Sequence, residues 1–228
     1  INAVIKILKS DQITQGETVT SFGSALAKYT GAKYGIAVSN GTAALHLALA
    51  SLDIKPGDEV ITTPMTFCAT ANAVLYLGGK VVFSDIDEKT LNININLLEK
   101  KITKRTKAII PVDFRGHPAN LPEIHELAMK YNLRVIEDGS HSIGSTYNHR
   151  NKLYHCGDGK HVDICTFSFH PVKHITTGEG GALLTNDKKI FDRISLQLKH
   201  GIDRREDMFI EEKRIGSWIY DMEYLGYN

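Results

Sequence analysis

The sequence is poor in three features, each of which would point to a particular class of protein. It has three cysteines among 228 residues, Cys68, Cys156 and Cys165. The cysteines are few and their number is odd, which argues against a disulfide framework. So few cysteines favour a reducing compartment such as the cytoplasm. No apolar run reaches the roughly 18 residues that a membrane-spanning helix needs. The formal net charge is only +1, so neither nucleic acid nor an anionic membrane is an expected partner.

The chain also lacks the glycine fingerprints of the common nucleotide-binding folds. The stretch "SNGTAAL" (39–45) follows a predicted strand and opens a predicted helix, but it is neither a Walker loop nor a G-x-G-x-x-G turn. A nicotinamide-binding Rossmann domain would need that fingerprint and an acidic residue about 20 positions later. The sequence therefore disfavours such a domain.

What the chain does have is a regular alternation of strand and helix patterns. Predicted strands cover 34–39, 60–64, 80–87, 107–114, 133–138, 164–169 and 181–186. Predicted helices cover 16–31, 40–54, 65–78, 94–102, 121–132 and 188–200. This order is typical of βαβ units, and it predicts an α/β fold with a mostly parallel sheet between helices, in one large domain.

Both ends of the chain look cut. The opening "INAVIKILKS" predicts a helix with Ile1, Val4, Ile5 and Leu8 on one face, and the closing "YDMEYLGYN" completes no unit. We therefore expect residues 1–228 to be a piece of a longer protein.

Residues of possible function follow the predicted strands, where ligands bind in parallel sheets. Gly41 and Thr42 stand at a helix start, which offers free N–H groups to an anion. Read alone, this is equally a plain helix cap made by Asn40 or Thr42. Asp138 and His141 follow another strand, and read alone they could be a capping carboxylate and a solvated histidine.

Ser168 and Lys173 follow a third strand, on either side of Pro171. A lysine amine forms a Schiff base with a carbonyl when burial or neighbouring groups lower its pKa. Read alone, Lys173 is one of 27 basic residues and an ordinary surface side chain.

Taken together, these residues match the needs of one cofactor, pyridoxal 5′-phosphate. Its phosphate needs a helix start such as Gly41 and Thr42, and its ring needs an aromatic partner such as Phe67. Its pyridine nitrogen needs a carboxylate such as Asp138, and its aldehyde needs an amine such as Lys173.

Seven motifs resemble the DegT/DnrJ/EryC1/StrS family of nucleotide-sugar aminotransferases, in the family's order and over nearly the whole chain. They are "ITQG" (13–16), "SNGTAALHLAL" (39–49), "PMTFCATANAV" (64–74), "GHPANL" (116–121), "VIEDGSHSIGSTY" (135–147), "FSFHPVKHITTGEGG" (167–181) and "LGYN" (225–228). The resemblance implies fold type I of the pyridoxal-phosphate enzymes. The chain would be most of the large domain, without the smaller C-terminal domain.

The resemblance also implies roles at the cofactor ring. Lys173 would bond the cofactor aldehyde and move a proton between the cofactor and the sugar carbon. Asp138 would pair with the pyridinium nitrogen, and Phe67 would stack on the ring. His141 would lie near the phenolic oxygen, where some relatives have glutamine.

Further implied roles concern the phosphate and the assembly. Gly41, Thr42 and Ser168 would bind the phosphate, and Asn228 would reach it from the partner subunit. The implied assembly is a homodimer with shared active sites.

Within the family, "VDFRGHPANL", "CGDGKHVDICTFSFHPVKHITTGEGG" and "WIYDMEYLGYN" resemble the subgroup that serves pseudaminic acid biosynthesis. This implies transfer of an amino group from glutamate to C4 of a UDP-4-keto-6-deoxy-N-acetyl-L-sugar. The alternative is another nucleotide-sugar 3- or 4-aminotransferase acting on a dTDP- or GDP-linked sugar. The resemblance places Asp11, Gln12, Ile13 and Thr14 along the substrate.

One departure from the family concerns Gly139 and Ser140, where many relatives have two alanines. Both residues are small, so we expect little effect on the cofactor, and any effect should concern sugar specificity.

Two competing functions remain to be weighed. A branch of the family replaces the lysine with histidine and becomes a sugar dehydratase; Lys173 is present here, which favours amino transfer. The second is a zinc-binding module built from Cys156, His161, Cys165 and His170. Their residue types suit zinc, but the spacing lacks a short C-x2-4-C pair. No metal is therefore expected.

Overall fold

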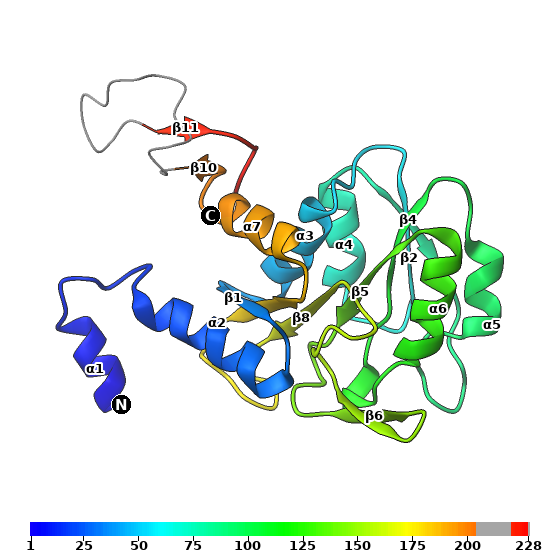
Figure 1. Cartoon of the computed structure of the whole chain (residues 1–228), viewed down its shortest axis with the longest axis horizontal. Coiled ribbons are helices and arrows are strands. Elements are labelled where there is room, and N and C mark those ends of the chain that lie inside the picture. The colour runs from blue at the N-terminus through cyan, green and yellow to red at the C-terminus, as the bar shows by residue number, and fades with distance from the viewer. Residues whose placement is uncertain (204–219, 228) are drawn as a thin grey trace.

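A single sheet forms the centre of the computed structural model, which describes residues 1–203 and 220–227 (Figure 1). Across this sheet the seven strands of the described chain run in the order β1 (Tyr34–Val38), β9 (Gly181–Thr185), β8 (Ile164–Ser168), β5 (Arg134–Asp138), β4 (Thr106–Ile110), β2 (Glu59–Thr62) and β3 (Lys80–Phe83). Strand β9 runs antiparallel to the other six strands, which are parallel to one another. The predicted mostly parallel α/β sheet is confirmed.

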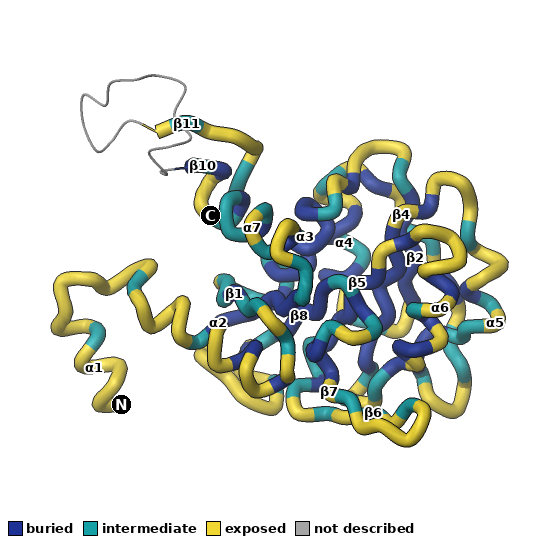
Figure 2. Tube along the Cα trace, in the orientation of Figure 1, coloured by how far each residue is buried: buried dark blue, intermediate teal, exposed yellow. Residues whose placement is uncertain are grey.

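Helices cover both faces of the sheet. One face packs against α3 (Gly41–Ser51), α4 (Ala69–Tyr76) and α7 (Lys188–Gln197). The other packs against α2 (Glu17–Thr30), α5 (Ile95–Leu98) and α6 (Leu121–Tyr131). Figure 2 shows the buried chain concentrated in the strands between these two layers.

Strand alternation decides which core each residue joins. Val135 packs in the core beneath α2 and α6, whereas Ile136 packs in the core beneath α3, α4 and α7. Because successive side chains of a strand point to opposite faces, Glu137 belongs to the first face and Asp138 to the second. The two acids that end β5 therefore lie in different surroundings.

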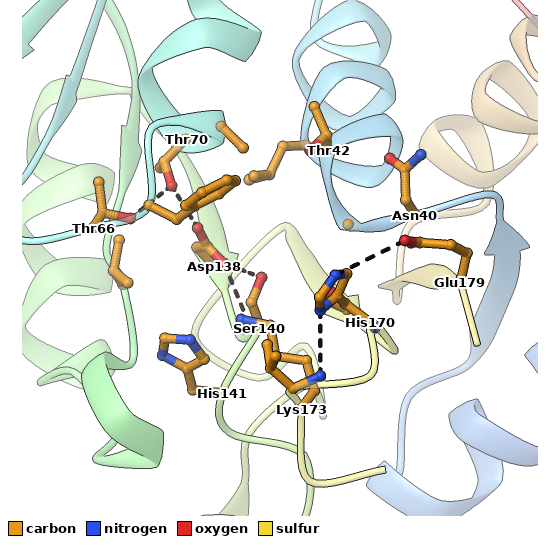
Figure 3. Close-up of a pocket in the computed structure, with 17 residues that line it drawn as sticks. Asn40, Thr42, Thr66, Thr70, Asp138, Ser140, His141, His170, Lys173 and Glu179 are labelled. Atoms are coloured by element: carbon orange, nitrogen blue, oxygen red, sulfur yellow. Dashed lines mark hydrogen bonds and ion pairs between the residues drawn. The ribbon is translucent and has the colours of Figure 1, made fainter. Parts of the chain in front are cut away.

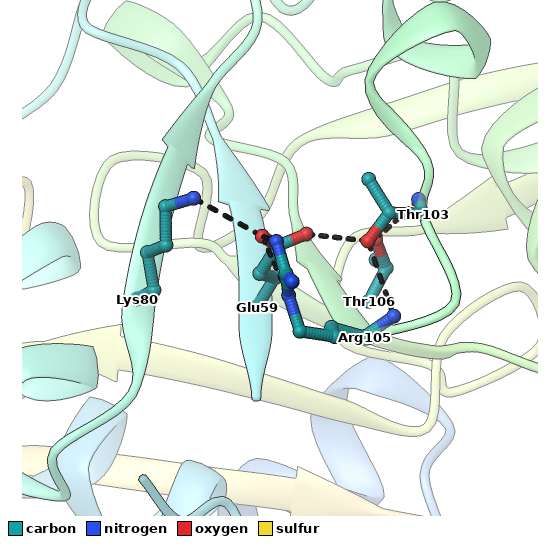
Figure 4. A network of polar contacts seen from close by, with 5 residues as sticks. All are labelled: Glu59, Lys80, Thr103, Arg105 and Thr106. Carbon is teal, nitrogen blue, oxygen red and sulfur yellow. Dashed lines mark hydrogen bonds and ion pairs between the residues drawn. The ribbon is translucent and has the colours of Figure 1, made fainter. Parts of the chain in front are cut away.

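The amino ends of three strands are tied together by one buried carboxylate (Figure 4). Glu59 of β2 accepts hydrogen bonds from Thr103 Oγ1 at 2.6 Å, Arg105 Nη2 at 2.8 Å and Lys80 Nζ at 3.2 Å. These bonds, with that of Thr103 the largest cause, lower the pKa of Glu59 to about 2. The network joins β2 to β3 and to the segment that leads into β4.

Local signals explain most helix ends. Asn40 begins α3 by accepting a hydrogen bond from the Ala43 amide at 2.8 Å. Gly31 ends α2 with φ at +91°, a left-handed conformation that glycine adopts without a steric penalty. Helix α4 begins at Ala69, later than predicted, so Phe67 stands in the turn that precedes it.

Other parts of the fold differ from the sequence expectation or add to it. The predicted first helix forms as α1 (Asn2–Leu8), but none of its residues is buried. A hairpin of β6 (Thr146–His149) and β7 (Lys152–His155), which the sequence pattern does not predict, follows β5. The remaining short elements are the 3-10 turns Glu99–Lys101 and Phe114–Gly116 and the strands β10 (Ile202–Asp203) and β11 (Asp221–Met222). Within the described residues, no helix combines the length and apolarity needed to cross a membrane.

Candidate active site

A cavity of about 510 Å³ opens at the carboxyl ends of β4, β5 and β8, beside the starts of α3 and α4 (Figure 3). The predicted site residues that line it are Gly41, Thr42, Phe67, Asp138, His141, Ser168 and Lys173. Residues that are far apart in the sequence thus meet in one place. The position agrees with the rule that ligands of parallel sheets bind beyond the carboxyl ends of the strands.

The start of α3 lies unusually close to the end of β8. A Cβ atom added to Gly41 would stand 2.8 Å from the Cβ atom of Ser168. Only glycine fits this approach, which places the Ser168 side chain against the first turn of the helix. Asn40 caps the helix, as the simpler interpretation expected, but it occupies only the Ala43 amide. The helix start can therefore be capped and still offer its first N–H groups to an anion.

Asp138 is held at the cavity wall by a chain of hydroxyl groups. Its Oδ2 accepts a hydrogen bond from Thr70 Oγ1 at 2.7 Å, and its Oδ1 accepts one from Ser140 Oγ at 2.6 Å. Thr66 Oγ1 lies 2.7 Å from Thr70 Oγ1. Because Thr70 already gives its proton to Asp138, Thr66 donates in that pair. The carboxylate is only 4% exposed, so its orientation is fixed.

Lys173 and His141 face the same cavity from two different loops. Burial lowers the pKa of the Lys173 amine, and the charge of Asp138 opposes that shift. Burial also lowers the pKa of His141, and the positive charge of Lys173 adds to the effect. The Nδ1 atom of His141 is buried and has no hydrogen-bond partner among the described residues. Both groups are therefore biased toward their neutral forms, in which an amine is a nucleophile and an imidazole can accept a proton.

Several residues that line the cavity were not predicted, namely Thr66, Thr70 and Glu179. Thr66 and Thr70 are four residues apart, at the entrance to a helix, and that spacing was the available sequence signal. His170 Nε2 lies 3.9 Å from Glu179 Oε1 at the rim. Ser140, expected to matter little for the cofactor, in fact contacts Asp138 directly.

Other predicted residues do not line this cavity. Asp11, Gln12, Ile13 and Thr14 are exposed in the segment between α1 and α2, and their contact with substrate stays a prediction. Asn228 lies outside the described residues.

The residues considered for zinc are dispersed. His170 lines the cavity, and His161 accepts or donates a hydrogen bond with the Tyr147 hydroxyl at 2.7 Å. Cys156 and Cys165 are buried, and neither lies with the two histidines in a metal-like cluster within the described chain. The four residues considered together do not form one site.

The sheet, its two helical layers and this cavity define the large α/β domain of the fold type I pyridoxal-phosphate enzymes. The chain belongs to the DegT/DnrJ/EryC1/StrS aminotransferase family, whose model matches residues 1–228.

Individual relatives agree with this assignment. The chain is 42% identical over 231 residues to a UDP-4-amino-4,6-dideoxy-N-acetyl-beta-L-altrosamine transaminase of Campylobacter jejuni, covering 100% of this chain and 57% of that protein. It superposes on Helicobacter pylori PseC, an aminotransferase involved in pseudaminic acid biosynthesis, with a TM-score of 0.84 at 34% identity, covering 100% of this chain and 57% of the other. It also resembles the PLP form of a sugar aminotransferase from Streptococcus pneumoniae, with a TM-score of 0.84 at 28% identity, covering 98% of this chain and 58% of the other. The chain thus spans somewhat more than half the length of these relatives.

Proposed function

We propose that residues 1–228 form the cofactor-binding large domain of an aminotransferase that uses pyridoxal 5′-phosphate and a nucleotide-linked keto-sugar. The observation that carries the proposal is the single cavity. It joins a helix start suited to phosphate, a fixed buried carboxylate, and a lysine whose pKa is lowered by burial. Each of these features meets a separate requirement of one cofactor.

The residues present fit that cofactor on physical grounds. Because Gly41 has no side chain, the Ser168 hydroxyl packs against the helix start, and the hydroxyl and the first N–H groups of α3 together form a cradle for phosphate. Asp138 directs a carboxylate toward the cavity, and Thr70 and Ser140 hold it in place. The unpartnered Nδ1 atom of His141 supplies a polar contact that the protein itself leaves unused.

Pyridoxal phosphate supplies an electron sink when it is bound. The protein's own residues do the rest. Asp138, fixed by two hydroxyl donors, would hold a proton at the ring nitrogen. The Lys173 amine would hold the cofactor through its aldehyde carbon, with the aldehyde oxygen leaving as water, and would move a proton between cofactor and substrate, since its lowered pKa leaves more of it neutral. Phe67 would cover one face of the ring.

The amino acceptor is the finer part of the proposal. Similarity to the Campylobacter jejuni transaminase supports C4 of a UDP-4-keto-6-deoxy-N-acetyl-L-sugar. Glutamate is proposed as the donor from the family resemblance alone. A dTDP- or GDP-linked keto-sugar is the alternative. The full-length protein incubated with glutamate and each of the three classes of keto-sugar distinguishes them, with 2-oxoglutarate release as the readout.

The assembly proposed is a homodimer with shared active sites, in which Asn228 and the segment Asp11–Thr14 complete the site. Light scattering of the full-length protein tests the dimer. Mixing an Asn228→Ala chain with a Lys173→Ala chain tests the sharing, because a mixed dimer regains one intact site only if Asn228 acts across the interface.

The cofactor assignment has a direct test. The protein should show a visible absorption band that borohydride removes, and mass analysis should find the added cofactor on the peptide that contains Lys173. Lys173→Ala should lose the band and the activity, whereas Lys107→Ala should keep both, because Lys107 is exposed on β4 and does not line the cavity. A colourless protein that carries one zinc ion per chain would refute the proposal.

A further inference from the structure

A second pair of carboxyl groups lies behind the cavity, on the opposite face of the sheet from Asp138. Glu137, the neighbour of Asp138 on β5, is 1% exposed, and Asp113, which follows β4, is 0% exposed. A carboxyl oxygen of each and the Sγ atom of Cys156 lie within 4.8 Å of one another. The function proposed above uses none of these groups.

The two carboxyl groups are unequally supplied with donors. Asp113 Oδ1 accepts a hydrogen bond from the Ala119 amide at 2.8 Å, and its Oδ2 accepts one from Ser142 Oγ at 2.6 Å. Among the described residues, Glu137 Oε2 accepts a single, longer hydrogen bond, from the Gly157 amide at 3.1 Å. Its Oε1 is buried and has no partner among the described residues. A buried carboxyl oxygen without a hydrogen-bond partner destabilises the folded state, unless the oxygen is protonated and can donate a hydrogen bond itself.

The surroundings of the pair supply no positive charge. Of the ion pairs found in the described part of the chain, none reaches Asp113 or Glu137. The titratable groups from neighbouring segments that interact with the pair are the thiols of Cys156 and Cys165 and the Tyr147 hydroxyl. All of these are neutral or negative, so two adjacent buried carboxylates would repel each other without compensation.

A proton on Glu137 would give its Oε1 a hydrogen to donate and would remove the repulsion between the two carboxyl groups. Burial raises the pKa of Glu137 well above its usual value, and the charge of Asp113 adds to that shift. Burial raises the pKa of Asp113 as well, but the hydrogen bonds from Ser142 and Ala119 favour its charged form and oppose that rise. The proton therefore belongs on Glu137 Oε1, where it turns an unpartnered acceptor into a donor.

We propose that Glu137 is a neutral carboxylic acid that donates a hydrogen bond to ionised Asp113, and that this pair positions the segment that carries Ser140 and His141 into the cavity. The connection runs through Ser142, whose hydroxyl binds Asp113 and whose amide binds the Gly139 carbonyl at 2.9 Å. The Asp113 amide also binds the Asp138 carbonyl at 3.1 Å. Glu137 and Asp113 are thus positioning residues, because neither lines the cavity.

A metal ion is the other occupant that Asp113, Glu137 and Cys156 could share. The hydrogen bonds already accepted by both Asp113 oxygens argue against it. Burial, with the charge of Asp113, also raises the pKa of the Cys156 thiol, and a metal ligand must be a thiolate. One shared proton accounts for the same geometry without an ion.

The first test concerns the proton and does not depend on the proposed function. The infrared spectrum of the full-length protein at neutral pH should contain the C=O band of one buried carboxylic acid. Glu137→Gln should remove this band, and Glu123→Gln, which changes an exposed glutamate on α6, should leave it unchanged. Absence of the band from the wild-type protein would overturn the proposal, as would one tightly bound metal ion per chain.

The second test concerns positioning, and it separates this role from bulk stability by a conservative rescue. Glu137→Ala should lower the melting temperature and shift the NMR titration midpoint of His141 in the cofactor-free protein. Glu137→Gln should restore both, because its amide still donates to Asp113. Asp113→Asn, although equally conservative, should behave like Glu137→Ala, because it removes the charged acceptor. If Glu137→Gln behaves like Glu137→Ala, the pair does not work as proposed, even where the protein still binds its cofactor.

Discussion

The replacement Gly41→Ala tests the phosphate cradle most directly. The added Cβ atom would stand 2.8 Å from Ser168 Cβ and 3.2 Å from Ser168 Oγ. Carbon atoms rest about 3.5–4.0 Å apart, so the start of α3 and the end of β8 must separate by roughly 0.7 Å. Overpacking of this kind costs about 1–3 kcal/mol. We therefore expect a lower melting temperature even in the cofactor-free protein.

The same displacement moves the first N–H groups of α3 and the Ser168 hydroxyl away from a shared anion. Loss of one hydrogen bond to a charged group costs about 1.5–3 kcal/mol. At about 1.4 kcal/mol per factor of ten, the dissociation constant for pyridoxal phosphate should rise roughly ten- to hundredfold. Titration of the cofactor-free protein, followed by absorbance, measures it.

Two companion variants make the result interpretable. Gly16→Ala adds a methyl group at the N-cap of α2, where its nearest neighbours are 3.6 Å away, so it creates no clash and cofactor affinity should stay close to wild type. Gly41→Ala combined with Ser168→Gly removes the clashing atom and should recover melting temperature without recovering affinity, because the hydroxyl is lost. If Gly41→Ala binds pyridoxal phosphate as tightly as the wild type, the cradle has been assigned to the wrong place.

Three further predictions follow from the contacts described. Thr70→Val removes the hydroxyl that donates to Asp138, so it should weaken cofactor binding about tenfold in the same titration. The control Thr30→Val, in α2, should leave cofactor binding unchanged. Lys173→Ala should raise the His141 midpoint measured by NMR, since the lysine charge helps to lower that pKa; an unchanged midpoint would show that the two groups do not interact. The pKa of Glu59 is about 2 in the folded chain against a usual 4.5, so its stabilising effect is complete above the higher value and is lost as the pH falls toward the lower. Glu59→Gln should therefore flatten the acid side of the stability curve, and an unchanged curve would contradict the network.

Much of the fold was predictable because local patterns carry it. The helix 16–31 and its glycine end were read from periodicity and from Gly31, and the structure places α2 there. The strand before Asp138 was read from a short apolar run, and β5 ends at that residue. By contrast, the β6–β7 hairpin was missed, since its strands are short and mostly exposed and so lack a clear apolar alternation.

The candidate site was predictable in its residue types and only partly in its contacts. Lysine, aspartate, a helix start and an aromatic residue each follow a strand, and parallel strands bring such positions to one edge. The roles of Thr70 and Ser140 could not be read in this way, because a hydroxyl next to a carboxylate is a matter of distance across the fold. The role of Glu137 could not be predicted either, because the sequence pattern gives no sign that it differs from Asp138 next to it.

By itself, then, the sequence determined the α/β alternation, the family and the set of groups that a pyridoxal-phosphate site requires. These depend on local periodicity and on motif order, which are properties of neighbouring residues. Only the tertiary structure decided which strands are neighbours, and therefore that β4, β5 and β8 share one cavity. It also decided that the last two acids of β5 serve opposite faces, one directed to the cavity and one buried against Asp113. The physical reason is that strand order and the packing between elements set the distances between these side chains. Neither can be predicted from the spacing of residues along the chain.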